Sequence, residues 1–382
     1  MRNLLRIILY KPINWAAKKF ASRPVPEKVF SALDTLYAEI LENPGKRGLL
    51  LPFDPIRDCF IIFSDQHKGN RDGADDFAGA ELNYLRALDH YSKNDFTYIN
   101  LGDSEELWEN SIWQVKKKNT AVFELEKIFL QKNKFIKIFG NHDLFWDNDP
   151  LAAWHLKDIY GEKLRVYEGL ILQSSGGAVD SRLFSGGAVD SRLLTPDSRL
   201  LFLTHGHQGD AQSDGNWFSK FFIANIWAPL QAFLRINPNT PAYDAEKKTL
   251  HNRIMYEWSA SKEKILLVTG HTHQPVFGSL THLERLFKQF QEALNKQDKA
   301  AEEKLRKEIR TREREFTSVA LDYMNMKPSY YNTGCCCFSD GDITGIELAE
   351  GEIRLVKWSM AKGREVLESI AISFELRVAS GE

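Results

Sequence analysis

The sequence has few cysteines, almost no net charge and no long apolar run. Its 382 residues include 4 cysteines, which is too few for a disulfide-stabilised scaffold. There are 50 Lys and Arg residues against 52 Asp and Glu residues, so the overall basic charge of a nucleic-acid-binding protein is missing and we expect no nucleic-acid partner. The most apolar long stretch, residues 217–234, contains Lys220 and Gln231 and falls short of the roughly 20 mostly apolar residues that a membrane-spanning helix needs.

The rest of the composition is that of an ordinary globular protein. Apolar residues make up 43% of the chain and charged residues 27%, which is enough apolar material for a large core. The apolar run at residues 4–10 contains Arg6, and no small-residue cleavage site follows it, so we expect no secretory signal. We therefore expect a cytoplasmic location, with peripheral membrane contact as an open alternative.

The first 28 residues differ in charge from the rest of the chain. They contain seven basic residues and one acidic residue, Glu27, among apolar side chains such as Trp15 and Phe20. This mixture fits a helix that lies on an anionic membrane surface. It also fits an amphipathic helix that covers a catalytic domain, and Pro12 interrupts the run. Both interpretations stay open, and residues 1–45 are treated as a basic amphipathic segment.

Five short apolar runs of strand length each end in a cluster of polar residues. The clusters are Asp65-Gln66-His67, Gly102-Asp103, Gly140-Asn141-His142-Asp143, His205-Gly206-His207 and Gly270-His271-Thr272-His273. Continuous apolar runs bounded by glycine predict strands that are buried on both faces. Helix-like stretches separate the first three runs, so we expect βαβ units with parallel pairing. Because ligands bind beyond the carboxyl ends of such strands, we expect the five clusters to converge on one site.

The residue types in these clusters favour a metal centre. They are carboxylates, imidazoles and an amide, with no thiolate, and this set suits Mn, Fe or Zn. One aspartate can bridge two ions, and a pair of ions about 3.5–4 Å apart is a common device for hydrolysing phosphate esters. Each cluster alone is a weak signal. All five in this order predict two divalent ions, with Mn as the first choice, and a phosphorylated substrate.

The order of these motifs resembles that of the calcineurin-like metallophosphoesterase superfamily. The matching motifs are Asp-x-His, Gly-Asp-x-x-Glu, Gly-Asn-His-Asp, His-Gly and Gly-His-x-His, within residues 59–280. The resemblance implies an α/β fold, a four-layer sandwich of two mixed β-sheets flanked by helices. It also implies the ligands of two ions, which are Asp65, His67, Asp103 and His273 for the first, and Asp103, Asn141, His205 and His271 for the second.

The resemblance also implies a mechanism. A metal-bridging hydroxide attacks phosphorus in line, His142 contacts the phosphate and protonates the leaving group, and Asp143 orients His142. A protonated imidazole near a dication needs a carboxylate partner at neutral pH, which agrees with that assignment. Either His205 or His207 could be the ligand after the fourth strand. We favour His205, which follows the strand directly, and expect His207 and Asp210 to bind substrate or orient ligands.

One branch of the superfamily, the UDP-2,3-diacylglucosamine diphosphatases, shares further features with the chain. The Gly-Asp-x-x-Glu-x-Trp motif at residues 102–108 and the insertion after His205 resemble that branch, whose members cleave a lipid-linked diphosphate at the membrane surface. The aromatic start of the insertion, residues 211–262, fits either an acyl-chain lid or a helical cap with an apolar core face. Its basic end, which includes Arg253, fits either phosphate binding or a solvated face. Members of the branch often have arginine where this chain has His142.

Two further insertions carry no catalytic motif. Residues 281–316, within an insertion that spans 281–327, have apolar residues at helical spacing and a break near Asn295, which predicts a charged helical hairpin. This hairpin fits either an arm for dimerisation or partner binding, or a solvated surface element. Residues 175–193 contain the sequence SGGAVDSRL twice, which predicts a turn-rich β extension in a loop.

The run Cys335-Cys336-Cys337 raises the question of a metal or redox role. It follows an Asn-Thr-Gly turn in a strand-like stretch, where neighbouring side chains point to opposite faces, so Cys335 and Cys337 share a face. We expect buried structural thiols, because free cysteines are commonly buried.

The ligand motifs interleave along the chain, which predicts a single catalytic domain over residues 46–382 rather than the about two or three domains that the length suggests. We expect a phosphohydrolase that cleaves a phosphoester or diphosphate bond. Two alternatives stay open. One is a lipid-linked nucleotide diphosphatase at the membrane surface, and the other is a non-catalytic binding scaffold on the same fold.

Overall fold

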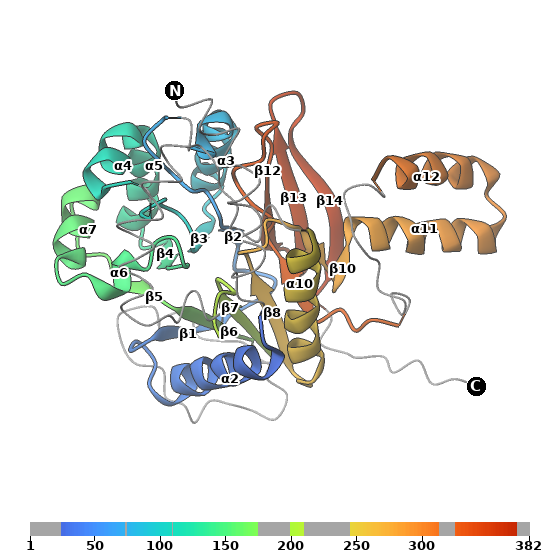
Figure 1. Cartoon of the computed structure of the whole chain (residues 1–382), viewed down its shortest axis with the longest axis horizontal. Coiled ribbons are helices and arrows are strands. Elements are labelled where there is room, and N and C mark those ends of the chain that lie inside the picture. Colours follow the sequence, from blue (N-terminus) through green and yellow to red (C-terminus); the bar gives the residue numbers. More distant parts are fainter. Residues whose placement is uncertain are drawn as a thin grey trace, which may run out of the picture.

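The computed structural model describes residues 24–72, 75–108, 110–174, 199–209, 245–312 and 325–372. Most of the basic N-terminal segment, the tandem repeat 175–193 and residues 210–244 of the predicted insertion lie outside the described residues. Within the described part, the chain forms two mixed β-sheets with helices on their outer faces (Figure 1). The predicted α/β sandwich is therefore confirmed.

The first sheet has the strand order β14-β13-β12-β2-β3-β4-β5. Its parallel half consists of β2 (Phe60–Phe63), β3 (Thr97–Leu101), β4 (Phe135–Ile138) and β5 (Val166–Tyr167). Its antiparallel half consists of β12 (Ile343–Ala349), β13 (Glu352–Ser359) and β14 (Gly363–Ala371), and β12 joins it to β2. The first three motif-bearing runs thus pair in parallel, as predicted.

The second sheet has the strand order β1-β6-β7-β8-β11-β9-β10. Its strands are β1 (Gly48–Phe53), β6 (Gly169–Ser174), β7 (Arg199–Thr204), β8 (Ile265–Thr269), β9 (Val276–Phe277), β10 (Leu280–Thr281) and β11 (Tyr330–Asn332). β8 pairs in parallel with both β7 and β11, whereas β6 and β7 are antiparallel. The last two motifs therefore follow strands of a different sheet from the first three.

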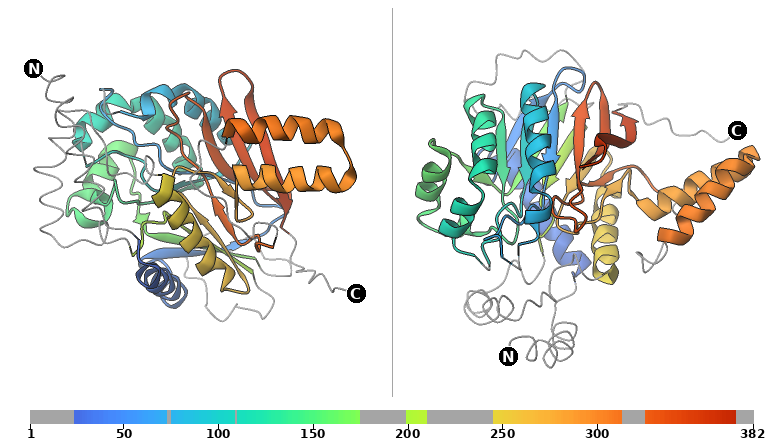
Figure 2. Two further views of the ribbon diagram at one scale, coloured as in Figure 1. Left: turned by 45° about the vertical axis from the view of Figure 1, so that its right-hand side comes forward. Right: turned by 90° about the horizontal axis from the view of Figure 1, so that it is seen from above.

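Helices cover the outer face of each sheet. The elements on the first sheet's side are the 3₁₀ turn η1 (Phe77–Gly79) and the helices α3 (Glu81–Lys93), α4 (Ile112–Lys118), α5 (Thr120–Gln131), α6 (Phe145–Asn148) and α7 (Ala152–Tyr160). The second sheet is covered by α2 (Pro26–Glu42), which contacts β1 and β6, and by α10 (Ala245–Ala260), which contacts β8 and β11. This arrangement gives the four layers that the resemblance implies (Figure 2).

Alternation along the strands explains why these runs are apolar throughout. In β2, Ile61 and Phe63 face the helices of the first sheet, while Phe60 and Ile62 face the second sheet. In β7, Phe202 likewise turns away from the first sheet and packs in the cluster formed with α2 and α10. Both faces of each strand are buried, so no polar alternation is left in the sequence.

Two segments that the sequence set apart pack against the second sheet. Helix α2, within the predicted 1–45 segment, packs on that sheet through Val29, Leu33, Leu36 and Ile40, which agrees with a helix that covers the catalytic domain. Residues 245–260, assigned to the cap insertion, form α10 and bury Met255 and Trp258 in the same apolar cluster. Among the described residues, no helix has the length and apolarity needed to cross a membrane.

The predicted charged hairpin consists of α11 (His282–Lys296) and α12 (Lys299–Arg312), and it projects from the sandwich (Figures 1 and 2). A capping box starts α11, because Thr281 and Glu284 satisfy each other's backbone N–H groups. At its base, Arg285 Nε donates to Glu368 Oε1 of β14 at 3.1 Å. The two helices share a small apolar cluster of their own that includes Leu286 and Ile309.

Candidate metal centre

The five predicted motifs meet beyond the carboxyl ends of β2, β3, β4, β7 and β8. Backbone hydrogen bonds join them in pairs. The N–H of Asp65 donates to Gly102 O, and the N–H of Gly270 donates to His205 O, both at 3.0 Å. Between the two sheets, the N–H of His271 donates to Asp65 Oδ2 at 3.0 Å. The motifs therefore converge as the strand ends predict.

Five of the seven predicted metal ligands have a left-handed backbone. They are Asp65, His67, Asp103, His271 and His273, with φ between 50° and 69°. Residues other than glycine rarely adopt this region, which costs about 1–3 kcal/mol each and is concentrated at functional sites. This concentration of strained residues in the motifs indicates a functional role for them.

Glycine at two motif positions leaves room for the neighbouring carboxylates. A Cβ at Gly140 would lie 2.2 Å from Asp103 Oδ1, and a Cβ at Gly270 would lie 2.5 Å from Asp65 Oδ2. Both contacts are shorter than van der Waals packing allows. A larger residue at either position would therefore displace a predicted ligand.

Asp65, His67 and His273 form one group of possible ligands. His273 Nε2 lies 3.2 Å from Asp65 Oδ1 and 3.1 Å from His67 Nε2. Two nitrogens held about 2.1 Å from one ion are about 3.0–3.4 Å apart, so the separation of the two imidazoles suits a shared ion. Burial acts to raise the pKa of Asp65, but the His273 and His205 imidazoles outweigh it and leave that pKa below its ordinary value.

Asp103, His205 and His271 form a second group. His205 Nε2 lies 3.1 Å from Asp103 Oδ2, while His205 Nδ1 lies 2.9 Å from Leu101 O. Donation of the Nδ1–H to this carbonyl makes Nε2 the acceptor nitrogen, which is the tautomer that a metal ligand needs. This contact favours His205 over His207 as the ligand.

Asp103 lies between the two groups. Its Oδ2 is 3.1 Å from His205 Nε2 and 3.9 Å from His67 Nε2, and its Oδ1 accepts the backbone N–H of His142 at 2.8 Å. Burial acts to raise the pKa of Asp103, but His205 and His142 hold it well below its ordinary value. An ionised carboxylate that faces both groups is suited to bridge two ions.

Several buried polar atoms of the site have no hydrogen-bond partner among the described residues, and two of them are acceptors that bear on the second ion. These two are Asn141 Oδ1 and His271 Nε2, both from predicted ligands of the second ion. An unpaired buried polar atom costs about 1–3 kcal/mol, so such atoms generally have a partner. Burial and the nearby His251 hold the pKa of His271 well below its ordinary value, which keeps its imidazole neutral and able to coordinate. The residues present therefore fit a divalent ion.

Glu106, rather than Asp143, holds the His142 ring. His142 Nδ1 lies 2.7 Å from Glu106 Oε2, and the ring stacks on Trp108 with centroids 4.2 Å apart. The same carboxylate oxygen is 3.0 Å from His67 Nδ1. Burial acts to raise the pKa of Glu106, but His142 and His67 lower it to about 2. One carboxylate thus contacts both a predicted ligand and the predicted proton donor.

Asp143 supports the backbone of the motif instead. Its Oδ1 accepts the N–H of Gly140 at 2.5 Å, and its Oδ2 accepts the N–H of Ser104 at 2.8 Å. Burial and the neighbouring Glu105 raise the pKa of Asp143 to about 6. The orienting role predicted for Asp143 does not match these contacts, because the backbone takes both oxygens. The Gly-Asp-x-x-Glu motif contained the other carboxylate, Glu106, but gave it no assigned role.

A fully buried set of charges lies behind the site and was not predicted. Lys137 Nζ is 2.9 Å from Glu105 Oε2, and Lys68 Nζ is 3.1 Å from Glu105 Oε1 and 2.9 Å from Glu126 Oε1. Lys68 directly follows a predicted ligand, and Glu105 directly precedes the carboxylate that holds His142. The available signal was Lys137, a charged residue in the middle of an apolar strand.

The three predicted substrate-binding residues have different surroundings. His207 is buried with its ring centroid 5.6 Å from that of His205. Asp210 lies outside the described residues. Arg253 is exposed on α10, and its Nε donates to Glu257 Oε1 at 2.8 Å within that helix. Of the two interpretations given for Arg253, the solvated face matches its contacts.

Helix α10 contacts the metal-binding motifs through His251 and Asn252 rather than through Arg253. His251 Nε2 lies 2.7 Å from Gly206 O, and Asn252 Oδ1 accepts the hydroxyl of Thr272 at 3.1 Å. These contacts tie α10 to the fourth and fifth motifs. Periodicity could not identify them, because α10 shows little segregation of apolar and polar residues along its sequence.

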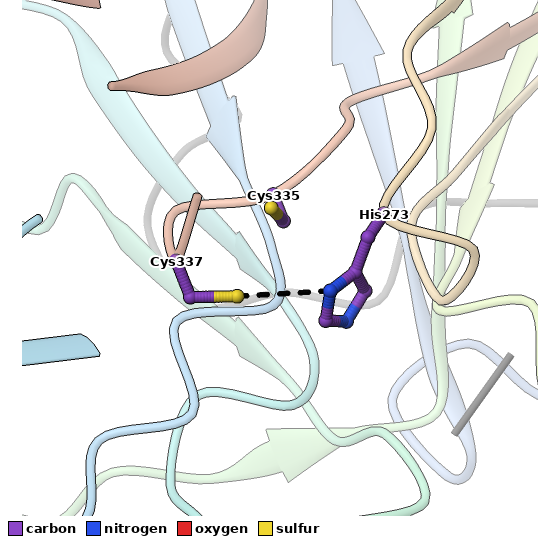
Figure 3. Close-up of side chains that lie close together, drawn as sticks. All are labelled: His273, Cys335 and Cys337. Atoms are coloured by element: carbon purple, nitrogen blue, oxygen red, sulfur yellow. Dashed lines mark hydrogen bonds between the residues drawn. The ribbon is translucent and has the colours of Figure 1, made fainter. Parts of the chain in front are cut away.

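Two of the three consecutive cysteines lie beside the first ligand group (Figure 3). Cys337 Sγ is 3.6 Å from His273 Nδ1, and Cys335 belongs to the same cluster. Cys336 is buried elsewhere, with its thiol 3.9 Å from Thr344 O. Cys335 and Cys336 are buried as expected, whereas Cys337 is only partly buried.

Comparisons with known proteins add little to this geometry. No protein-family model matches the chain, and no curated protein matches it. A solved structure that resembles it is that of a conserved uncharacterized protein, described as a predicted phosphoesterase, from Streptococcus pneumoniae TIGR4. The two are 12% identical over 82% of this chain and 97% of the other, with a TM-score of 0.31. A similarity of this size carries no conclusion about the reaction.

Proposed function

We propose that this protein is a divalent-metal-dependent phosphohydrolase. The observation that carries the proposal is the position of Asp103, whose Oδ2 faces His67 on one side and His205 on the other. Two groups of hard and borderline ligands that share one ionised carboxylate are suited to a pair of divalent ions. The resemblance of the motifs to metallophosphoesterases points to the same class of reaction.

Seven side chains would hold the two ions. Asp65, His67 and His273 would bind one, Asn141, His205 and His271 would bind the other, and Asp103 would serve both. We expect Mn²⁺, with Fe²⁺ or Zn²⁺ as alternatives, because the set mixes nitrogen and oxygen donors. When bound, such a pair of ions activates water and neutralises charge on the phosphoryl oxygens.

The protein's own contribution to the reaction centres on His142. We assign the proton transfer to the leaving oxygen to Nε2 of this ring, because Glu106 engages Nδ1 at 2.7 Å. The Glu106 carboxylate stabilises the protonated imidazole, and the stacked Trp108 ring fixes the plane in which the proton is delivered. Asp143 maintains the backbone turn that carries His142.

Hydrolysis assays with defined metals test the proposal. The protein is stripped with a chelator, reloaded with Mn²⁺, Fe²⁺ or Zn²⁺, and assayed with p-nitrophenyl phosphate and bis(p-nitrophenyl) phosphate while bound metal is counted by mass spectrometry. We expect turnover that depends on metal, and its loss in Asp103→Asn. Asp89→Asn, at an exposed residue paired with Lys93 on α3, is the matched control and should keep full activity. Metal-loaded protein without turnover on any substrate would favour the binding scaffold.

Substitution of His142 separates proton transfer from metal binding. His142→Ala should lower kcat by about 10²–10⁴-fold, the usual contribution of a general acid, while the metal content stays largely unchanged. Full activity in this variant would contradict the assignment.

The lipid-linked diphosphatase alternative depends mainly on the aromatic part of the 211–262 insertion, and residues 210–244 lie outside the described residues. We therefore keep the substrate class at phosphoesters and diphosphates. Adding UDP-2,3-diacylglucosamine to the assay panel tests the narrower assignment directly.

A further inference from the structure

We propose that Cys335, Cys337 and His273 form a separate binding site for a thiophilic metal ion, of the kind of Zn²⁺ or Cu⁺. The site lies next to the proposed phosphohydrolase centre and shares only the imidazole of His273 with it. The two ligands from Cys335 and Cys337 would be thiolates, and the metal ligands predicted at the five strand ends include no thiolate. The proposal concerns a third ion, separate from the two of the proposed centre, and does not depend on hydrolysis.

The geometry of the three side chains suits one ion. Their ligand atoms all lie within 4.8 Å of one another, and His273 Nδ1 is 3.6 Å from Cys337 Sγ (Figure 3). An ion that binds sulfur at about 2.3 Å and nitrogen at about 2.0–2.1 Å in tetrahedral geometry places those atoms about 3.6 Å apart. The observed separation therefore needs little adjustment to accept such an ion, and three ligands leave its fourth position open.

The backbone holds the two thiols in place. β11 ends at Asn332, so the three cysteines lie in irregular backbone rather than in the predicted strand-like stretch. Cys335 and Cys337 both lie beside His273, whereas the Cys336 thiol lies 3.9 Å from Thr344 O. The N–H of Cys336 donates to Asp65 O at 3.1 Å, and the carbonyl of Cys335 accepts the N–H of Thr344 at 3.1 Å. Ligands held in this way lose little conformational entropy on binding, which raises affinity.

The two nitrogens of His273 face different ligand sets. Nε2 is 3.2 Å from Asp65 Oδ1, within the first group of the proposed centre, whereas Nδ1 faces the thiols. Soft thiolates prefer Zn²⁺ or Cu⁺, while carboxylates and imidazoles also accept Mn²⁺, so the two sides of this ring select different ions.

Solvent can reach the side chains of this site. His273 and Cys337 are partly exposed, so an ion can reach the site from solvent. Each thiol that coordinates the ion releases its proton to solvent, and His273 also releases its N–H proton when both of its ring nitrogens coordinate ions.

Cobalt spectroscopy tests the site without reference to activity. The full-length, reduced protein is titrated with Co²⁺, and thiolate coordination is read from the sulfur-to-cobalt charge-transfer band in the ultraviolet. We expect one thiolate-bound cobalt per chain, displaced by Zn²⁺. Cys337→Ser, at the partly exposed position, should lose most of the band, and Cys335→Ser should do the same if it folds.

Two controls separate this proposal from the proposed function. Cys336→Ala removes the intervening thiol and should keep the band in full. Asp103→Asn should also keep the band while losing hydrolysis, so that failure of one proposal leaves the other measurable. Absence of the band in the wild-type protein, or an unchanged band in Cys337→Ser, would overturn the thiolate site.

Discussion

Glu106 places one negative charge between two imidazoles with different tasks. Its Oε2 is 3.0 Å from Nδ1 of His67, a predicted ligand, and 2.7 Å from Nδ1 of His142, the proposed proton donor. A carboxylate in this position fixes the tautomer of the ligand and stabilises the protonated form of the donor. Metal affinity and proton transfer are therefore coupled through one residue.

The variant Glu106→Gln tests this coupling. The amide keeps the shape of the side chain but removes the charge, so we expect both metal affinity and kcat to fall by about 10–100-fold. The alkaline limb of the kcat–pH profile should also move to lower pH, because loss of the negative charge disfavours the protonated imidazole. Metal titration and the pH dependence of p-nitrophenyl phosphate hydrolysis measure the two effects.

Asp143→Asn is the matched comparison for that variant. Asp143 accepts one backbone N–H group on each of its oxygens, and an asparagine amide can accept only one of them, so this variant weakens the turn that carries His142 without touching the charge beside the ring. This variant should leave the alkaline limb where it is. A shift equal to that of Glu106→Gln would return the orienting role to Asp143.

At the scale of elements, strand β4 carries a buried charge toward the site. Lys137 is fully buried in the middle of the strand and pairs with Glu105, whose pKa is lowered to about 2 because Lys137 and Lys68 outweigh the effect of burial. Trp146 Nε1, on α6, donates to the same carboxylate at 2.8 Å. The strand, the helix and the Glu105 loop are thereby locked together behind the metal ligands.

Removing this charge should destabilise the whole fold. Lys137→Met leaves Glu105 with one cationic partner, and we expect a loss on the order of 3 kcal/mol in the free energy of unfolding at pH 7. The Glu105 pKa in the folded state lies below its ordinary value of 4.5, so its stabilisation is complete above pH 4.5 and disappears as the pH falls through 2. The difference between variant and wild type should therefore shrink over that interval.

Urea unfolding at several pH values measures this effect. Lys93→Met removes a lysine from an exposed pair with Asp89 and should change stability by less than about 1 kcal/mol. Equal losses in the two variants would contradict the role given to the buried charges.

At the scale of the whole molecule, the sequence predicted the strands and their polar ends better than their partners. Strands buried on both faces are apolar throughout, and the polar residues at their carboxyl ends stand out for that reason. This pattern located Asp65, Asp103 and His205 correctly at the carboxyl ends of their strands. The same pattern is identical for a strand in either sheet, so it could not assign β7 and β8 to the second sheet.

Contacts between distant segments explain the remaining differences. Asp143 is next to His142 in sequence, but the turn directs its carboxylate to the backbone, and Glu106 reaches the ring from another strand end. Cys337 lies 64 positions from His273, and only the fold brings them together. Spacing within a motif does not encode either contact.

The hairpin α11–α12 contributes little to the packing of the two-sheet sandwich. The insertion leaves and rejoins the sandwich at neighbouring points, because Ser279 Oγ donates to Lys327 O at 2.5 Å and Ser279 N–H donates to Tyr330 O at 2.7 Å. Its apolar cluster is internal to the two helices. The two predictions for the hairpin, an arm for dimerisation or partner binding and a solvated surface element, both leave it without a part in hydrolysis, and they differ in whether the chain self-associates.

Excision of the hairpin tests whether it is needed for hydrolysis and whether it mediates self-association. Replacement of residues 282–324 by a short Gly-Ser linker should leave metal content and turnover unchanged, because the ligands lie on strand ends that the hairpin does not form. If the hairpin is a dimerisation arm, sedimentation of the full chain should show a concentration-dependent oligomer, and the excised chain should stay monomeric. The variant Arg285→Ala removes the contacts with Glu368 and with Leu280 O at the base of the hairpin, and separates loss of anchoring from loss of the helices. A monomeric full-length chain would support the solvated surface element, whose charged residues face solvent and whose small apolar cluster is shared between its own two helices.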